Sequence, residues 1–179
     1  PPGLQLRCAR CQQAPPAFDR TVALFGYAAP VDRLILRLKY RADLRLARVL
    51  GVRLAATVLA QAAATADLIV PVPLHVTRLR ERGYNQALEL ARPIGKRLRV
   101  PVDYRSVTRV RATAPQIDMD HDARRKNVRR AFRVNADFTG RRIAIVDDVM
   151  TSGHTVNAVA AALRKAGAAE VAVWIVARA

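Results

Sequence analysis

The chain has 179 residues, and its 31 Lys and Arg residues against 14 Asp and Glu give it a net charge of +17. Half of the residues (51%) are apolar, which excludes a wholly disordered chain and leaves one packed domain with a short appendage as the expected organisation. The charge favours a polyanionic partner, such as a phosphate, a nucleic acid or an anionic surface. No apolar run approaches the roughly 18 residues of a membrane span. We therefore expect no membrane insertion.

The first third of the chain is expected to add a strand and two helices to an irregular start. Residues 1–20 carry four prolines and no periodic pattern. Aromatic and β-branched residues predict a strand over 21–27, and apolar spacing predicts helices over 31–40 and about 44–64.

A first strand–loop–helix unit follows. It consists of a buried strand over Leu68–Val72, a loop over Pro73–Gly83 and a helix from about Asn85 to Leu98. Pro71 is awkward in a strand because it cannot donate to the ladder, and Pro93 should kink or interrupt the helix.

A second such unit ends the chain. We expect a strand over Ile143–Val146, a loop over Asp147–Gly153, a helix over Thr155–Ala166 that Gly167 ends, and a last strand over Val171–Val176. Alternating strands and helices predict an α/β fold, with a parallel sheet of about four or five strands flanked by helices on both faces.

Residues 105–130 break this pattern, because they are polar, basic and lack an apolar period. We expect a long mobile loop there, and loops of that length in a compact domain are usually functional or disordered.

The end of the second unit's first strand carries the most informative pattern. Asp147 and Asp148 stand where open α/β sheets place their ligands, and a loop with hydroxyls and Gly153 then opens a helix whose N–H groups and dipole favour an anion. The predicted phosphate-binding residues are Thr151, Ser152, Gly153, His154 and Thr155. A capped helix alone is the simpler alternative. A receiver domain is disfavoured because no Asp follows Asp148.

The stretch from Ile143 to Thr155 resembles the phosphoribosyl pyrophosphate motif of type I phosphoribosyltransferases. Further segments are similar to the ComF family of competence-associated phosphoribosyltransferase-like proteins. These segments are Cys8-x-x-Cys11, Leu34-Ile35-x-x-Leu38-Lys39-Tyr40, Val70-Pro71-Val72-Pro73-Leu74, Arg82-Gly83-Tyr84-Asn85-Gln86-Ala87, Thr113-x-x-Gln116, and Arg124-x-x-Asn127-Val128. The resemblance covers nearly the whole chain.

The resemblance implies a fold, a ligand and roles for individual residues. It implies a type I phosphoribosyltransferase fold that binds phosphoribosyl pyrophosphate, or a similar sugar phosphate, with Mg²⁺. Asp147 and Asp148 would hold the ribose 2′ and 3′ hydroxyls, and residues 151–155 the 5′-phosphate. The pyrophosphate loop would contain Pro73, Leu74, His75, Arg78 and Arg82. The hood that closes over the site would be residues 105–130, with Gln116, Arg124 and Asn127 as its matching residues.

The two cysteines supply half of a metal site. Structural zinc commonly takes four ligands, and only Cys8 and Cys11 are present. The family has an N-terminal zinc module, so residues 1–20 are interpreted as its remnant and residues 21–179 as the phosphoribosyltransferase-like domain. We expect zinc only where the full module is present. So few cysteines indicate a reducing compartment, hence the cytoplasm.

The charge exceeds what one sugar phosphate needs. Residues 78–133 alone hold 16 Lys and Arg against 6 Asp and Glu, which favours a nucleic-acid surface, although few aromatic residues accompany them. Three functions stay open: an active phosphoribosyltransferase with an unknown acceptor, a ligand-sensing regulator, or a protein for DNA uptake, where the family resemblance implies single-stranded DNA as a partner. The sequence predicts no oligomeric state.

Overall fold

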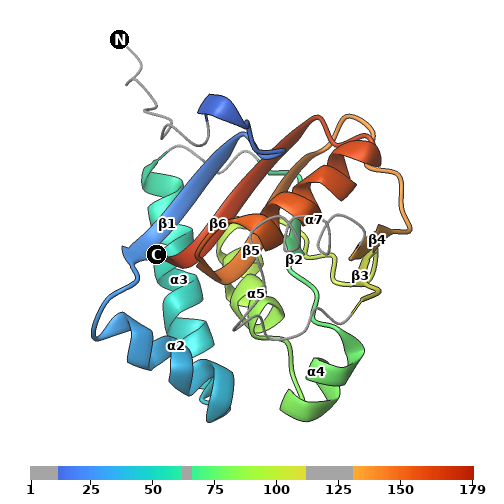
Figure 1. Ribbon diagram of the computed structural model, residues 1–179. Coiled ribbons are helices and arrows are strands. Elements are labelled where there is room, and N and C mark those ends of the chain that lie inside the picture. The colour runs from blue at the N-terminus through green and yellow to red at the C-terminus, as the bar shows by residue number, and fades with distance from the viewer. Residues whose placement is uncertain (1–11, 62–65, 112–130) are drawn as a thin grey trace.

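The computed structural model describes residues 12–61, 66–111 and 131–179, and a four-stranded parallel sheet forms its centre (Figure 1). The strands are β1 (Arg20–Gly26), β2 (Leu68–Pro71), β5 (Arg142–Met150) and β6 (Glu170–Arg178), in the order β1-β6-β5-β2. Val146 pairs with Pro71 on one side and with Trp174 on the other. Because all four strands are parallel, their carboxyl ends meet at one edge of the sheet.

Helices cover both faces of this sheet, as the sequence predicts (Figure 1). They are α2 (Val31–Tyr40), α3 (Leu44–Ala60) and α5 (Gln86–Leu98) on one face, and α7 (His154–Lys165) on the other. Leu54, Leu90 and Trp174 are buried in the first core, and Ile145 and Leu163 in the second. Among the described residues, no helix is long and apolar enough to cross a bilayer.

Two shorter elements flank the sheet. A small antiparallel sheet joins β3 (Val107–Arg109) to β4 (Phe132–Val134), and buried Val107 places it on the α7 face. Helix α4 (Val76–Arg82) projects beyond the carboxyl end of β2 (Figure 1).

The prediction of a loop over Pro73–Gly83 was wrong, because α4 lies within it. His75 caps this helix by accepting from the Thr77 amide at 3.4 Å, and Gly83 ends it with a φ of +81°. The helix buries none of its residues. It therefore has no apolar stripe from which it could be predicted.

The predicted loop over Asp147–Gly153 begins too early, because β5 continues to Met150. The strand stays paired with β6 as far as Met150 opposite Arg178, and the Arg178 guanidinium also donates to the Met150 carbonyl. Both acids therefore lie inside the strand. Residues 107–109, which the predicted loop over 105–130 includes, likewise form a strand.

Pro93 does not interrupt α5, which runs unbroken to Leu98. Its ring lies against Gly51 of α3, where an added Cβ would come within 2.5 Å of Pro93 Cγ. Pro71 is tolerated in β2 because β2 is an edge strand of the central sheet.

Replacement of Gly51 should test this close approach of α3 to α5. We expect Gly51→Ala to lower stability by about 1–3 kcal/mol, because the Pro93 ring and the Leu90 carbonyl leave no room for a methyl group. Gly26→Ala is the matched control, since nothing lies within 4 Å of its added Cβ. Thermal unfolding of both variants measures the difference; equal melting temperatures would contradict the packing.

Candidate functional site

The topology of the sheet places a crevice at the carboxyl ends of β2 and β5. The chain leaves β2 for α5 on one face and leaves β5 for α7 on the opposite face. Ligands of open α/β sheets bind where the connections diverge in this way. The predicted acidic pair and the predicted phosphate loop both lie at this point.

The two acids face opposite sides of the sheet, since successive strand residues alternate. Both are buried, with exposed fractions of 8% for Asp147 and 3% for Asp148. In each, Oδ1 accepts from the next backbone amide at 2.9 Å, which fixes the carboxylate plane. A ligand over the strand end would meet one acid from each face.

The ammonium of Lys39 neutralises Asp148. Its Nζ lies 2.8 Å from Asp148 Oδ2, and it comes from the last turn of α2. Burial acts to lower the pKa of Lys39, but the charge and hydrogen bond of Asp148, aided by Asp147, outweigh burial and raise this pKa above its ordinary value. Lys39 therefore stays charged across the neutral range.

Asp147 is in a different electrostatic state. Burial raises its pKa well above the ordinary value, and the neighbouring charge of Asp148 raises it further, against the opposing effects of the Asp148 amide and Lys39. Neighbouring carboxylates in different states are common in sites that bind or transform a ligand.

The loop between β5 and α7 contains the residues that the sequence predicts to bind an anion. Gly153 has a φ of +76° and stands directly before the helix, and no side chain of the described residues is seen to cap that end. Ser152 Oγ lies 2.9 Å from His154 Nδ1. Thr151 and Ser152 are exposed, and Gly153, His154 and Thr155 are half-buried. The structure thus brings all five predicted phosphate-binding residues to the end of β5.

A cavity of about 250 Å³ lies between α2 and α4, and Lys39, the partner of Asp148, is one of its lining residues. Its walls include three cations and one carboxylate, which are Lys39, Arg78, Arg82 and Glu81. Arg78 and Arg82 of the predicted pyrophosphate loop thus line the same cavity as Lys39. Pro73, Leu74 and His75 are half-buried in the segment that leads from β2 into α4.

Contacts on both sides of Lys39 fix its helix to this cavity. The Tyr84 hydroxyl donates to the Leu38 carbonyl, and the Arg82 guanidinium lies 5.6 Å from the centre of the Tyr40 ring. Arg82 also donates to Gln86 Oε1 at 2.5 Å. The end of α2 is therefore held by residues from α4 and the start of α5.

Arg109 of β3 is a further cation near the acids. Burial lowers its pKa, as does the charge of Arg78, while Asp147 opposes them. Its guanidinium lies 5.6 Å from the centre of the Phe132 ring. The small antiparallel sheet thus brings a positive charge toward the Asp147 side of β5.

Sequence reasoning gave no site role to Lys39 and treated Arg109 only as one of several loop cations. A signal for Lys39 existed, because Leu38-Lys39-Tyr40 lies in a segment that resembles the ComF family. The hood residues Gln116, Arg124 and Asn127 lie outside the described residues, and so do Cys8 and Cys11. Their predicted roles stay predictions.

Within ranges 12–61, 66–111 and 131–179, no three His, Cys, Asp or Glu residues gather closely enough to hold a metal ion. The carboxylates of Asp147 and Asp148 are the oxygen ligands that Mg²⁺ prefers, but Lys39 already neutralises one of them. The described acids therefore form no metal site by themselves, and a magnesium ion at this place would have to arrive with a phosphate ligand and keep several waters.

Comparison with known proteins identifies the domain. Residues 47–179 match the family described as "Phosphoribosyl transferase domain". The DNA utilization protein YhgH of Escherichia coli K12 is 40% identical over 177 residues, which cover 97% of this chain and 78% of that protein. Competence protein F of Haemophilus influenzae is 35% identical over 179 residues, which cover 96% and 78% of the two chains.

Solved structures were also compared. The crystal structure of a purine phosphoribosyltransferase from Pyrococcus horikoshii Ot3 is 18% identical in sequence and superposes with a TM-score of 0.42. The match covers 84% of this chain and 74% of that protein's chain.

The two acids should respond oppositely to neutralisation. Because the folded-state pKa of Asp147 lies above its ordinary 3.8, the folded protein holds a proton that the unfolded chain releases, and stability falls as pH rises through this window. Asp147→Asn removes that loss and should raise Tm near pH 7.

Asp148→Asn should instead lower Tm by about 3–6 °C, because it leaves the Lys39 ammonium without its carboxylate. Melting curves from pH 4 to pH 8 measure both effects, and the advantage of Asp147→Asn should grow with pH. Equal shifts in the two variants would contradict the different states of the acids.

Proposed function

The chain belongs to the ComF family of phosphoribosyltransferase-like proteins, and we propose that it binds phosphoribosyl pyrophosphate together with Mg²⁺. The observation that carries this proposal is the N-terminus of α7, which no described side chain caps, directly after the strand that holds the acidic pair. A helix N-terminus suits a phosphate, and carboxylates accept hydrogen bonds from a vicinal diol. A ribose 5-phosphate unit satisfies both requirements.

The cavity that Lys39 lines, next to its contact with Asp148, supports a diphosphate on the same sugar. Lys39, Arg78 and Arg82 line it against the single carboxylate Glu81. A diphosphate carries several negative charges, and guanidinium groups bind phosphate oxygens in pairs. Mg²⁺ bound to the diphosphate would neutralise part of its charge and polarise it as a leaving group.

Where such a ligand reacts, the bond between the anomeric carbon and the diphosphate breaks and a bond from that carbon to an incoming nucleophile forms. The transition state has a cationic sugar, and the residues of this chain would position the sugar and stabilise the departing negative charge. Ligand sensing without turnover uses the same binding residues.

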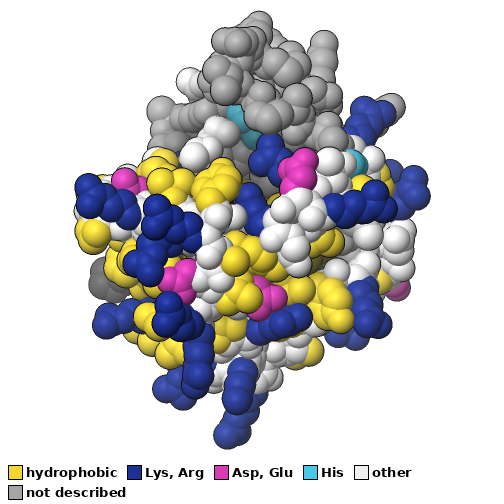
Figure 2. Space-filling view, turned by 90° about the horizontal axis from the view of Figure 1, so that it is seen from below, with side chains coloured by type: hydrophobic (Ala, Val, Ile, Leu, Met, Phe, Trp, Pro, Cys, Tyr) yellow, Lys and Arg dark blue, Asp and Glu magenta, His cyan; other side chains and the backbone are white. Residues whose placement is uncertain are grey.

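DNA handling is the second candidate function, and the surface charge favours it. Figure 2 shows Lys and Arg side chains spread over the face that it presents. The exposed arginines of α2, α3 and α4 are Arg33, Arg37, Arg41, Arg45, Arg48, Arg53, Arg78 and Arg80. Two relatives carry names that refer to DNA utilization and competence. Single-stranded DNA is the polyanion that we propose for this surface.

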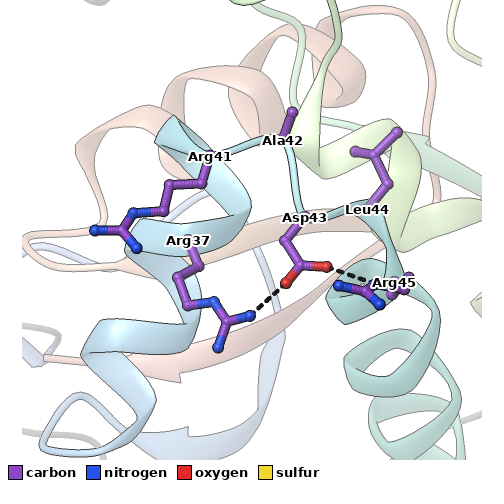
Figure 3. Close-up of a pocket in the computed structure, with 6 residues that line it drawn as sticks. All are labelled: Arg37, Arg41, Ala42, Asp43, Leu44 and Arg45. Atoms are coloured by element: carbon purple, nitrogen blue, oxygen red, sulfur yellow. Dashed lines mark hydrogen bonds and ion pairs between the residues drawn. The ribbon is translucent and has the colours of Figure 1, made fainter.

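The turn between α2 and α3 supplies a hollow of about 560 Å³ on this surface (Figure 3). Asp43 bridges two of its arginines, with 2.7 Å to Arg37 and 3.2 Å to Arg45. Arg41 points away from Asp43. Three arginines and one carboxylate line this hollow, so its lining is net positive.

The sugar-phosphate proposal is tested by calorimetric titration with phosphoribosyl pyrophosphate and MgCl₂. Replacing both Asp147 and Asp148 with Asn should weaken binding by about thirtyfold or more, because two charge-assisted hydrogen bonds to the ribose are lost. Asp137→Asn is the control, since Asp137 is exposed, precedes β5 and contacts Thr139 instead. Unchanged affinity in the double variant would show that the acids do not hold the sugar.

Turnover separates the remaining functions. Release of pyrophosphate in the presence of a panel of free nucleobases would establish a phosphoribosyltransferase. If the protein binds phosphoribosyl pyrophosphate but releases no pyrophosphate with any of the nucleobases, DNA handling or ligand sensing is favoured.

The DNA proposal is tested by titrating single-stranded oligonucleotides at several salt concentrations. Changing Arg37, Arg41 and Arg45 to Gln should reduce the slope of log K against log salt by about 2, since each lost phosphate contact on a single strand contributes about 0.7. The matched control changes three exposed arginines at and beyond the C-terminal end of α5 to Gln. They are Arg97, Arg99 and Arg105. Equal losses in both triple variants would mean that diffuse charge, not this face, binds DNA.

A further inference from the structure

Helix α2 supplies three consecutive residues to the site, although it precedes residues 47–179, which the domain family covers. The Leu38 carbonyl accepts from Tyr84, the Lys39 ammonium pairs with Asp148, and the Tyr40 ring lies beside Arg82. The end of this helix is therefore part of the site and not merely a cover on α3.

We propose that Lys39 is a ligand-binding residue that recognises the diphosphate group of the bound sugar. The inference rests on the proposed function and adds a residue from outside the matched domain. In it, one ammonium group holds Asp148 in place for the sugar and donates to diphosphate oxygens in the adjoining cavity.

The exposure of the ion pair supports a role beyond that of a counter-ion. The Asp148 side chain is 4% exposed, whereas that of Lys39 is 23% exposed and forms part of the cavity wall. An ammonium group has three N–H donors, and one of them suffices for the contact at 2.8 Å with Asp148. Its other donors are available to an anion that enters the cavity.

The surroundings of Lys39 favour a diphosphate over a single phosphate. Arg78 and Arg82 converge on the same cavity from α4, so three cations on two helices enclose the space. The contacts of Leu38 and Tyr40 hold Lys39 in position before a ligand arrives, which reduces the entropic cost of binding. A monophosphate at the N-terminus of α7 would not need this second cluster of cations.

The test uses inorganic pyrophosphate with MgCl₂ as the probe, because it contains no ribose and so does not require the acids. Lys39→Met should weaken its binding by about tenfold or more, as expected for a lost charged hydrogen bond. Lys39→Arg should keep affinity within about threefold, since it retains the charge and donors. Arg33→Met, an exposed site on the same helix, removes the same charge and should have little effect.

A second pair of variants separates ligand binding from support of Asp148. Lys39→Met leaves Asp148 buried without its cation, so it is also made in Asp148→Asn, where no unpaired charge results. Adding Lys39→Met to Asp148→Asn should cost about tenfold in pyrophosphate affinity relative to Asp148→Asn alone. Thermal melting confirms that each variant is folded.

Each result decides the proposal. If the double variant binds pyrophosphate as well as Asp148→Asn does, Lys39 is only a counter-ion and the proposal is wrong. It is also wrong if the wild type binds phosphoribosyl pyrophosphate but not pyrophosphate, in which case the proposed function survives. Binding of pyrophosphate through Lys39 without binding of the sugar diphosphate would keep this assignment and refute the proposed function. Binding of neither refutes both.

Discussion

The site depends on one electrostatic constraint: two adjacent carboxylates lie buried at the end of a central strand, and one lysine compensates one of them. Two ionised acids in such surroundings would oppose folding. The ion pair of Lys39 with Asp148 and the raised pKa of Asp147 resolve this conflict in different ways. The protein alone compensates only part of the negative charge of the two carboxylates. A ligand that donates hydrogen bonds to both carboxylates, or that brings a cation, would compensate the rest.

The arrangement of charge around this point is consistent with a ligand that is acidic at both ends and neutral in the middle. The N-terminus of α7 lies on one side of the acids, and the cavity with Lys39, Arg78 and Arg82 lies on the other. The wider arginine surface is a separate feature, because it continues past the cavity to the turn at Asp43. One chain can therefore offer both a small-molecule site and a polyanion surface, which share Arg78, while the arginines of the turn at Asp43 belong to the surface alone.

The sequence predicted the α/β class, the parallel sheet and most helix positions, because apolar periodicity reports directly on burial. It predicted the position of the acids and the phosphate loop from a strand–loop–helix pattern that local residues determine. It missed α4, because a helix with no buried side chain has no apolar stripe. It gave no role to Lys39, because that role depends on a contact between residues 109 positions apart, which no local pattern contains.

Strand β1 also lies outside the family match, and its place in the sheet has a consequence for any shortened form of the protein. It covers the outer side of β6, a nine-residue strand whose residues from Val171 to Ala177 are all buried. A fragment cut at residue 47 would expose that apolar edge as a template for intermolecular strand pairing. Such a truncation would be prone to aggregation, even though it would contain every residue of the recognised domain.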